Sequence, residues 1–214
     1  GRKRDRTWAG RAGCTLSHRA AIEYARAHGW RTLLILEDDI ELAPDFDAVL
    51  DALPAALDEA GWDVCYLGFT DPKPPYRKLA TLPAGHALYR VAGASTTHAY
   101  LLRDTSFDWL LARLPDARRV WGWTAMHRAI DRWYYRNLAR RFRVCAVSPS
   151  IVNQAGGVSD ITQRAHEKAH ATRVDHPGHG ALAHALLGAW RWLGYRLAEP
   201  RDWLRGQIKR VRGF

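Results

Sequence analysis

The chain has 214 residues, 47% hydrophobic and 25% charged, which is enough apolar content to bury the core of one domain. No run of about 18 uncharged apolar residues occurs, so the sequence predicts no membrane-spanning helix. The net charge of +10 is carried by 27 arginines and 5 lysines, dispersed along the chain and not gathered beside base-stacking aromatic residues, so we expect no nucleic-acid partner.

Helical and extended patterns alternate through the first two thirds of the chain. A helix is expected over 17–28, an apolar strand over 31–36, and a helix over 44–60 that is interrupted at Pro54. The remaining expected elements are strands at 63–69, 86–91, 97–102 and 142–147, and helices at 106–114 and 123–139, with a flexible stretch, AGAST, between the two middle strands. This alternation predicts a three-layer α/β domain with a mainly parallel sheet.

Three acids follow the apolar strand in the segment LLILEDDIEL, and ligands of open α/β sheets bind beyond the carboxyl ends of strands. In an extended chain Glu37 and Asp39 point to one face and Asp38 to the other. Two carboxylates on one face suit a hard divalent cation, Mn²⁺ or Mg²⁺. The alternative is an acidic, solvated turn.

Five segments occur in an order that resembles glycosyltransferase family 25, the lipopolysaccharide and lipooligosaccharide biosynthesis enzymes. They are GCTLSH (13–18), LILEDDIEL (34–42), HAYLL (98–102), AIDRW (129–133) and VSPSIVNQAGGVSDI (147–161). The resemblance covers roughly residues 10 to 163, which we expect to form a family 25-like domain. The strand that usually precedes these segments in the family has no counterpart here, so the expected domain is shortened at its N-terminus.

The resemblance implies a GT-A-like, Rossmann-like fold and a metal-dependent glycosyltransferase. The enzyme would move a hexose, galactose above all, from a UDP-sugar to a lipopolysaccharide-type or other glycan or glycolipid acceptor, with inversion. Glu37 and Asp39 would hold Mn²⁺ or Mg²⁺ on the diphosphate of the nucleotide-sugar donor, and Asp38 would contact the sugar, the ribose or an arginine. The bound metal would stabilise the departing nucleoside diphosphate.

An inverting transfer also needs a base for the acceptor hydroxyl. Asp131, in AIDRW, is one candidate, although it could instead pair with Arg128 or Tyr135 on a helix. Asp160 is the other candidate and acts with Ser159 on a glycine-rich loop, but both residues also suit a helix N-cap.

Three further residues are expected at the substrate. His18 either contacts the ligand or is buried near the start of its helix. Trp123 either stacks on a sugar ring or belongs to the core. Gln154, in the last of the five segments, is expected to bind the substrate.

HEKAH, residues 166–170, matches the H-E-x-x-H pattern of zinc hydrolases. Its surroundings hold no large apolar residue to bury the other face of such a helix, which makes a zinc hydrolase a minor alternative. His166 or His170 could instead be a further ligand of the glycosyltransferase metal.

The last part of the chain, 164–214, changes in character to a linker rich in histidine and alanine and a basic, tryptophan-rich amphipathic helix. The segment 185–214 suits a membrane interface with anionic lipid, or packing on the domain. Three widely spaced cysteines favour a reducing compartment. We therefore expect a cytoplasmic protein with peripheral contact to the inner membrane. A catalytically inactive glycosyltransferase-like protein that binds a glycan or a partner is the alternative function.

Overall fold

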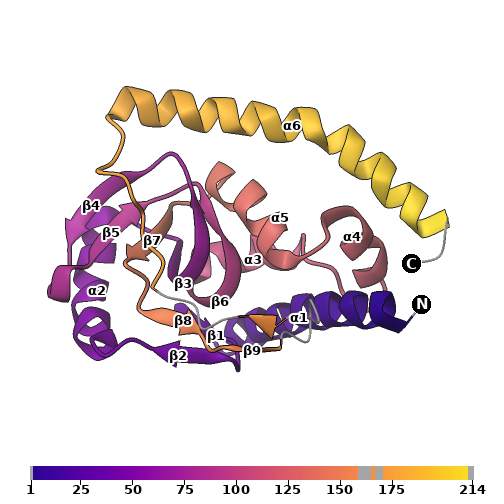
Figure 1. Ribbon diagram of the computed structural model, residues 1–214, viewed down its shortest axis with the longest axis horizontal. Helices are drawn as coiled ribbons and strands as arrows, with labels where there is room; N and C mark the ends of the chain where they lie inside the picture. Colours follow the sequence, from indigo (N-terminus) through magenta and orange to yellow (C-terminus); the bar gives the residue numbers. More distant parts are fainter. Residues whose placement is uncertain (1, 159–164, 167–170, 212–214) are drawn as a thin grey trace.

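The computed structural model describes residues 2–158, 165–166 and 171–211. In this part of the chain a six-stranded sheet forms the centre of the molecule (Figure 1). Its strands lie in the order β1 (Thr32–Leu36), β6 (Gly93–Arg103), β3 (Val64–Lys73), β7 (Val144–Ser148), β5 (Ala87–Arg90) and β4 (Arg77–Thr81).

The sheet is mixed, so the expectation of a mainly parallel sheet was wrong. Among the pairs of this sheet only β3 and β7 are parallel, and the other four are antiparallel. β6 is inserted between β1 and β3 and runs against both, so that β1, β3 and β7 still share one direction. An apolar run marks a buried strand, but it carries no information about the direction of its neighbours.

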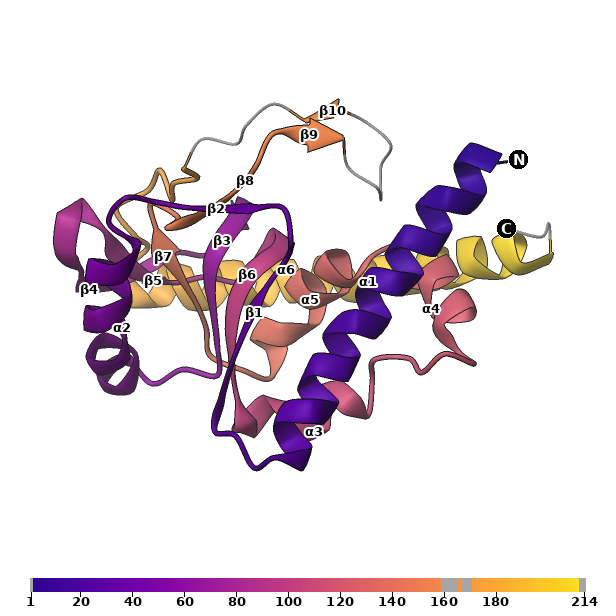
Figure 2. The same ribbon diagram turned by 90° about the horizontal axis from the view of Figure 1, so that it is seen from below.

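Helices cover both faces of the sheet, as the three-layer prediction requires (Figure 2). One face packs against α1 (Arg2–Ala27), α3 (Phe107–Leu111) and α5 (Ile130–Asn137). The other face packs against α2 (Phe46–Ala60), which buries Val49, Leu53 and Leu57 at the four-residue spacing of one helix face.

Two helices are longer or more regular than expected. α1 begins fifteen residues before the predicted start at residue 17, and Thr15 donates to the carbonyl of Arg11 within the helix (2.9 Å). α2 continues through Pro54, which lies on the exposed side of the helix. Water can there bond the carbonyl that the proline leaves without a donor, so the helix is not interrupted.

The helix expected over 123–139 is two helices, α4 (Val120–His127) and α5, because Arg128 between them has a φ of 74°. The stretch AGAST, expected to be flexible, belongs to β6 apart from its first residue. The remaining short elements are β2 (Ile40–Leu42), η1 (Pro83–Gly85), η2 (Asp104–Ser106), η3 (Leu138–Arg140), β8 (Val152–Gln154), β9 (Gly157–Val158) and β10 (Ala165–His166). β2 pairs with β8, and β9 pairs with β10, each antiparallel.

The last helix, α6 (Ala181–Val211), runs along the outside of the molecule over α4 and α5 (Figure 1). Its end returns to the start of α1, where the Lys209 ammonium lies 5.2 Å from the centre of the Trp8 ring. None of the helices described is both long and apolar enough to cross a bilayer. All three cysteines are free.

Candidate active site at the carboxyl end of strand β1

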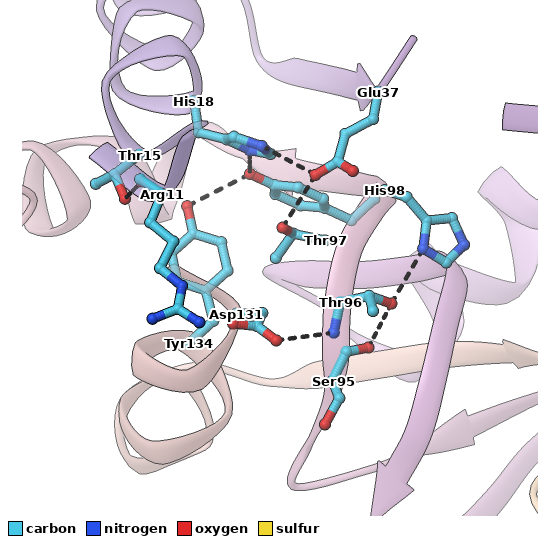
Figure 3. A network of polar contacts seen from close by, with 11 residues as sticks. Arg11, Thr15, His18, Glu37, Ser95, Thr96, Thr97, His98, Asp131 and Tyr134 are labelled. Carbon is cyan, nitrogen blue, oxygen red and sulfur yellow. Dashed lines mark hydrogen bonds and ion pairs between the residues drawn. The ribbon is translucent and has the colours of Figure 1, made fainter. Parts of the chain in front are cut away.

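A cavity of about 390 Å³ lies where the end of β1 meets the start of β6. α1, α5 and β8 supply the rest of its lining. Figure 3 shows how polar residues of α1, β6 and α5 meet near Glu37. Three residues predicted from the sequence line this cavity, namely Glu37, Asp131 and Gln154. β8 carries Gln154 to the site because its pairing with β2 sets Gln154 opposite Ile40, just past the three acids.

Glu37 is held by a chain of buried polar groups. Its Oε1 lies 3.5 Å from His18 Nε2 and accepts a hydrogen bond from Thr97 Oγ1 at 3.4 Å. His18 Nδ1 lies 2.7 Å from the hydroxyl of Tyr100, which in turn lies 3.4 Å from that of Tyr134. His18 is only 4% exposed, so it orients the Glu37 carboxylate from the interior of the protein.

Asp131 is in the first turn of α5 and is fixed by backbone donors. Its Oδ2 accepts the N–H of Thr96 at 3.2 Å, and its Oδ1 accepts the N–H of Arg132 at 2.6 Å. Thr96 has a φ of 62°, and such strain in a residue other than glycine is commonly found at functional sites. The side chains of Arg128 and Tyr135 were expected as alternative partners of Asp131, but the two backbone N–H groups hold it instead.

Arginines line the same cavity beside these carboxylates, namely Arg11, Arg128 and Arg132. Partial burial and then the charge of Arg128 lower the pKa of Arg11, while Asp131 opposes this shift. Burial and then the charges of Arg128, Arg205 and Arg11 likewise lower the pKa of Lys209. Arg11 and Lys209 thus lie in a positive region, and such a region favours a bound anion.

A mixed set of possible metal ligands surrounds Glu37, whereas the expectation that Glu37 and Asp39 together hold Mn²⁺ or Mg²⁺ stays a prediction. Among the described residues, the group of three side chains whose ligand atoms lie within 4.8 Å of one another is Cys14, His18 and Glu37. Sulfur, nitrogen and oxygen together are typical of zinc and related transition ions, whereas Mg²⁺ takes oxygen ligands and Mn²⁺ favours them. Asp39 is not part of this group.

The other two acids of the triplet are exposed. Partial burial and then the charges of Glu37 and Asp38 raise the pKa of Asp39, because neighbouring like charges disfavour its ionised form. The carbonyl of Asp39 accepts the N–H of Ala155 at 2.8 Å and thereby fixes the turn against the end of β8. Neither Asp38 nor Asp39 lines the cavity.

Trp123 is a core residue, which corrects its assignment to the substrate. It is 8% exposed, and its ring lies 4.8 Å from that of His127 and 6.1 Å from that of Trp133. Stacking on a sugar would require an exposed ring face.

Several predicted residues fall outside the described residues. Ser159 and Asp160 do so, as do Glu167 and His170 of the HEKAH motif. The backbone of His166 lies in strand β10, so the described part of HEKAH is extended, not helical. The side chain of His166 is outside the described ones, and its expected role as a ligand stays a prediction.

Sequence reasoning missed the arginines and Thr96. The arginines carry no local signal, because they belong to 27 spread through the chain. Thr96 could only have been noticed as part of the AGAST stretch between two predicted strands. Comparison of the chain with models of known protein families gives no match, and comparison with curated proteins gives none.

Proposed function

We propose that this chain is a glycosyltransferase that moves a hexose from a UDP-sugar to a hydroxyl group of a lipopolysaccharide-type or other glycan. One observation carries the proposal. A single cavity at the carboxyl end of β1 combines the carboxylates of Glu37 and Asp131 with three arginines. A sugar nucleotide has the complementary parts, a diphosphate for the cations and sugar hydroxyls for the polar groups.

The arginines are proposed to bind the diphosphate. A guanidinium can bind two phosphate oxygens at once and keeps its charge under all relevant conditions. As the bond between the sugar and the diphosphate breaks, negative charge grows on the leaving oxygen. Arg11, Arg128 and Arg132 can stabilise this charge as preorganised donors. Glu37 and Gln154 then remain to accept and donate hydrogen bonds to the hydroxyls of the sugar.

Asp131 is proposed as the base. The acceptor oxygen forms a bond to the anomeric carbon while its proton passes to the Asp131 carboxylate. The bond from that carbon to the diphosphate oxygen breaks, and the bonding electron pair leaves with the diphosphate. The transition state has the oxocarbenium character of other reactions at an anomeric carbon, and attack from the opposite face inverts its configuration.

A second candidate is a catalytically inactive binding protein. β1 is an edge strand of the sheet, and two of its side chains are exposed, Leu34 at 37% and Leu36 at 43%. An apolar edge of this kind favours a protein partner. In this case the acids beyond β1 would only be a solvated strand end.

Calorimetric titration with UDP, followed by a screen of UDP-hexoses for UDP release in the presence of glycan acceptors, separates the two functions. The titration is run without metal and with Mn²⁺ or Zn²⁺. We expect UDP to bind the wild type, and Arg128→Ala to weaken its binding about tenfold or more. Asp47→Asn, a change of an exposed acid on α2, is the control and should leave binding unchanged. Absence of UDP binding under all three conditions refutes the proposal, and binding without transfer to any acceptor favours the second candidate.

A further inference from the structure

Helix α6 is packed on the domain through its polar and small residues. Asp202 is 9% exposed and accepts hydrogen bonds from Arg136 and, at 3.5 Å, from Arg132. Gly206 lies so close to α4 that a Cβ there would be 2.7 Å from the side chain of Met126. Tyr195 lies under the guanidinium of Arg136, 5.4 Å from it. The face of α6 that meets the protein is therefore the hydrophilic one.

The opposite face of α6 is apolar and exposed. Its large side chains recur at intervals of three, four or seven residues, which places them on one stripe of a helix. The stripe consists of Leu182 (74% exposed), Leu186 (62%), Trp190 (75%), Leu193 (43%), Leu197 (74%), Leu204 (56%) and Ile208 (44%). At about 1.5 Å per residue it is about 40 Å long. Figure 1 shows that this helix forms the outer border of the molecule, with the domain on one side only.

An apolar surface of this length indicates a binding surface for a partner or a membrane, because the exposed apolar patches of monomers are normally much smaller. The charges of α6 indicate what binds there. The helix carries six basic residues and two acidic ones, and Arg196, Arg201 and Arg205 are exposed to the sides of the stripe. Two copies joined along their stripes would bring these like charges together, whereas an anionic lipid surface complements them.

We infer that α6 binds the surface of a membrane that contains anionic lipid. The helix lies in the plane of the interface, its stripe enters the boundary between headgroups and acyl chains, and its arginines contact lipid phosphates. Trp190 suits this depth because its ring is apolar and its N–H is polar. The end of α6 also carries Lys209 into the positive region beside the cavity, so membrane binding would hold the candidate site close to the lipid surface.

Flotation of the full chain with vesicles tests this inference. Vesicles of phosphatidylcholine alone are compared with vesicles in which about a third of the lipid is phosphatidylglycerol. We expect the wild type to float with the anionic vesicles, and to do so less as salt rises. The double change Leu186→Glu with Leu197→Glu should lower the bound fraction at least about fivefold, because it places two charges in the apolar stripe.

The matched control is the double change Ala181→Glu with Ala185→Glu. It adds the same charge at exposed positions of the same helix, away from the stripe. It should keep most of the binding, and circular dichroism should show equal helix content in all variants. The inference is overturned if the control and stripe variants lose binding equally, or if neutral vesicles bind as much protein. It is also overturned if the wild type fails to float and light scattering gives twice the mass of one chain, since the stripe would then join two copies.

Discussion

At the scale of single residues, the candidate site is organised around how its carboxylates are held. Asp131 accepts two backbone N–H groups and sits in the first turn of α5, next to the positive end of that helix. Glu37 contacts side chains instead, namely those of His18 and Thr97. The two acids are therefore suited to different tasks, and each can be tested separately.

Asp131→Asn tests the proposed base. The amide keeps one oxygen, which can accept the N–H of Thr96 or that of Arg132, while the carboxylate that would take the proton is lost. We expect turnover to fall about 10²- to 10⁴-fold with little change in donor affinity, measured as UDP release against donor concentration. An equal loss in Asp47→Asn, or unchanged turnover in Asp131→Asn, would remove Asp131 from the reaction.

The reactivity of the Cys14 thiol tests the arrangement around Glu37 without an assay of activity. Burial and then the charges of Glu37 and Asp131 raise the pKa of the Cys14 thiol to about 12. In Glu37→Gln one of these charges is lost, the pKa falls and the thiolate fraction at pH 8 rises. We expect severalfold faster alkylation by iodoacetamide, followed by mass spectrometry of the Cys14 peptide. Asp38→Asn, a neighbouring exposed acid, should leave the rate as it is, and an unchanged rate in Glu37→Gln would contradict the arrangement.

At the scale of elements, the attachment of α6 depends on few groups. Asp202 is paired with Arg132 and Arg136, while Glu199 on the same helix pairs with Arg140 and Arg196 and is 49% exposed. Burial alone would raise the pKa of Asp202, but the hydrogen bond and charge of Arg136 and the charge of Arg132 lower it overall. Its stabilising effect is therefore complete above the ordinary Asp pKa of about 3.9 and is lost as the pH falls through the lower, folded-state pKa.

Asp202→Asn should release α6 from the domain. It leaves two arginines facing each other without their counter-charge, at a cost of about 2–4 kcal/mol. Hydrogen exchange of the α6 amides should then accelerate, while the amides of α2 keep their protection. Glu199→Gln is the control and should change little, because exposed ion pairs contribute at most about 1 kcal/mol. Equal protection of α6 in both variants would show that other contacts hold the helix.

At the scale of the whole molecule, the sequence predicted the three layers and most strands but not how the strands pair. Apolar runs such as Leu33–Leu36 are visible in the sequence, whereas the insertion of β6 between β1 and β3 depends on how the intervening chain folds back. The extension of α1 was missed because its first residues are mostly basic and lack a continuous apolar stripe, although Trp8 and Ala12 are buried. The break at Arg128 has no local signal, since arginine is a good helix former.

The sequence likewise predicted several residues of the candidate site but not how they contact one another. The five segments identified Glu37, Asp131 and Gln154, and the fold brings these residues to one cavity. The same segments did not reveal that His18 and Cys14 would be the neighbours of Glu37, because the approach of α1 to the end of β1 is a tertiary contact. Trp123, outside these segments, was expected either to stack on a sugar or to belong to the core, and it packs against Trp133 in the core.

His127 links the pH to the stability of the whole molecule. Burial and then the charge of Arg136 lower the pKa of His127 to about 4, Arg132 adds to this shift, and Asp202 opposes it. In the unfolded chain the ordinary value is about 6.5, so between pH 6.5 and pH 4 the unfolded state binds more protons than the folded state. The free energy of unfolding should therefore decrease as the pH is lowered through this window.

Urea unfolding at several pH values between 7 and 4 measures this dependence. His127→Gln should flatten the curve in that window, and His28→Gln, which removes an exposed histidine at the end of α1, should keep the wild-type curve. The lowered pKa values of Asp63 and Asp202 act in a separate range, because their stabilisation is lost only below about pH 4. A curve for His127→Gln as steep as that of the wild type would assign the acid sensitivity to other groups.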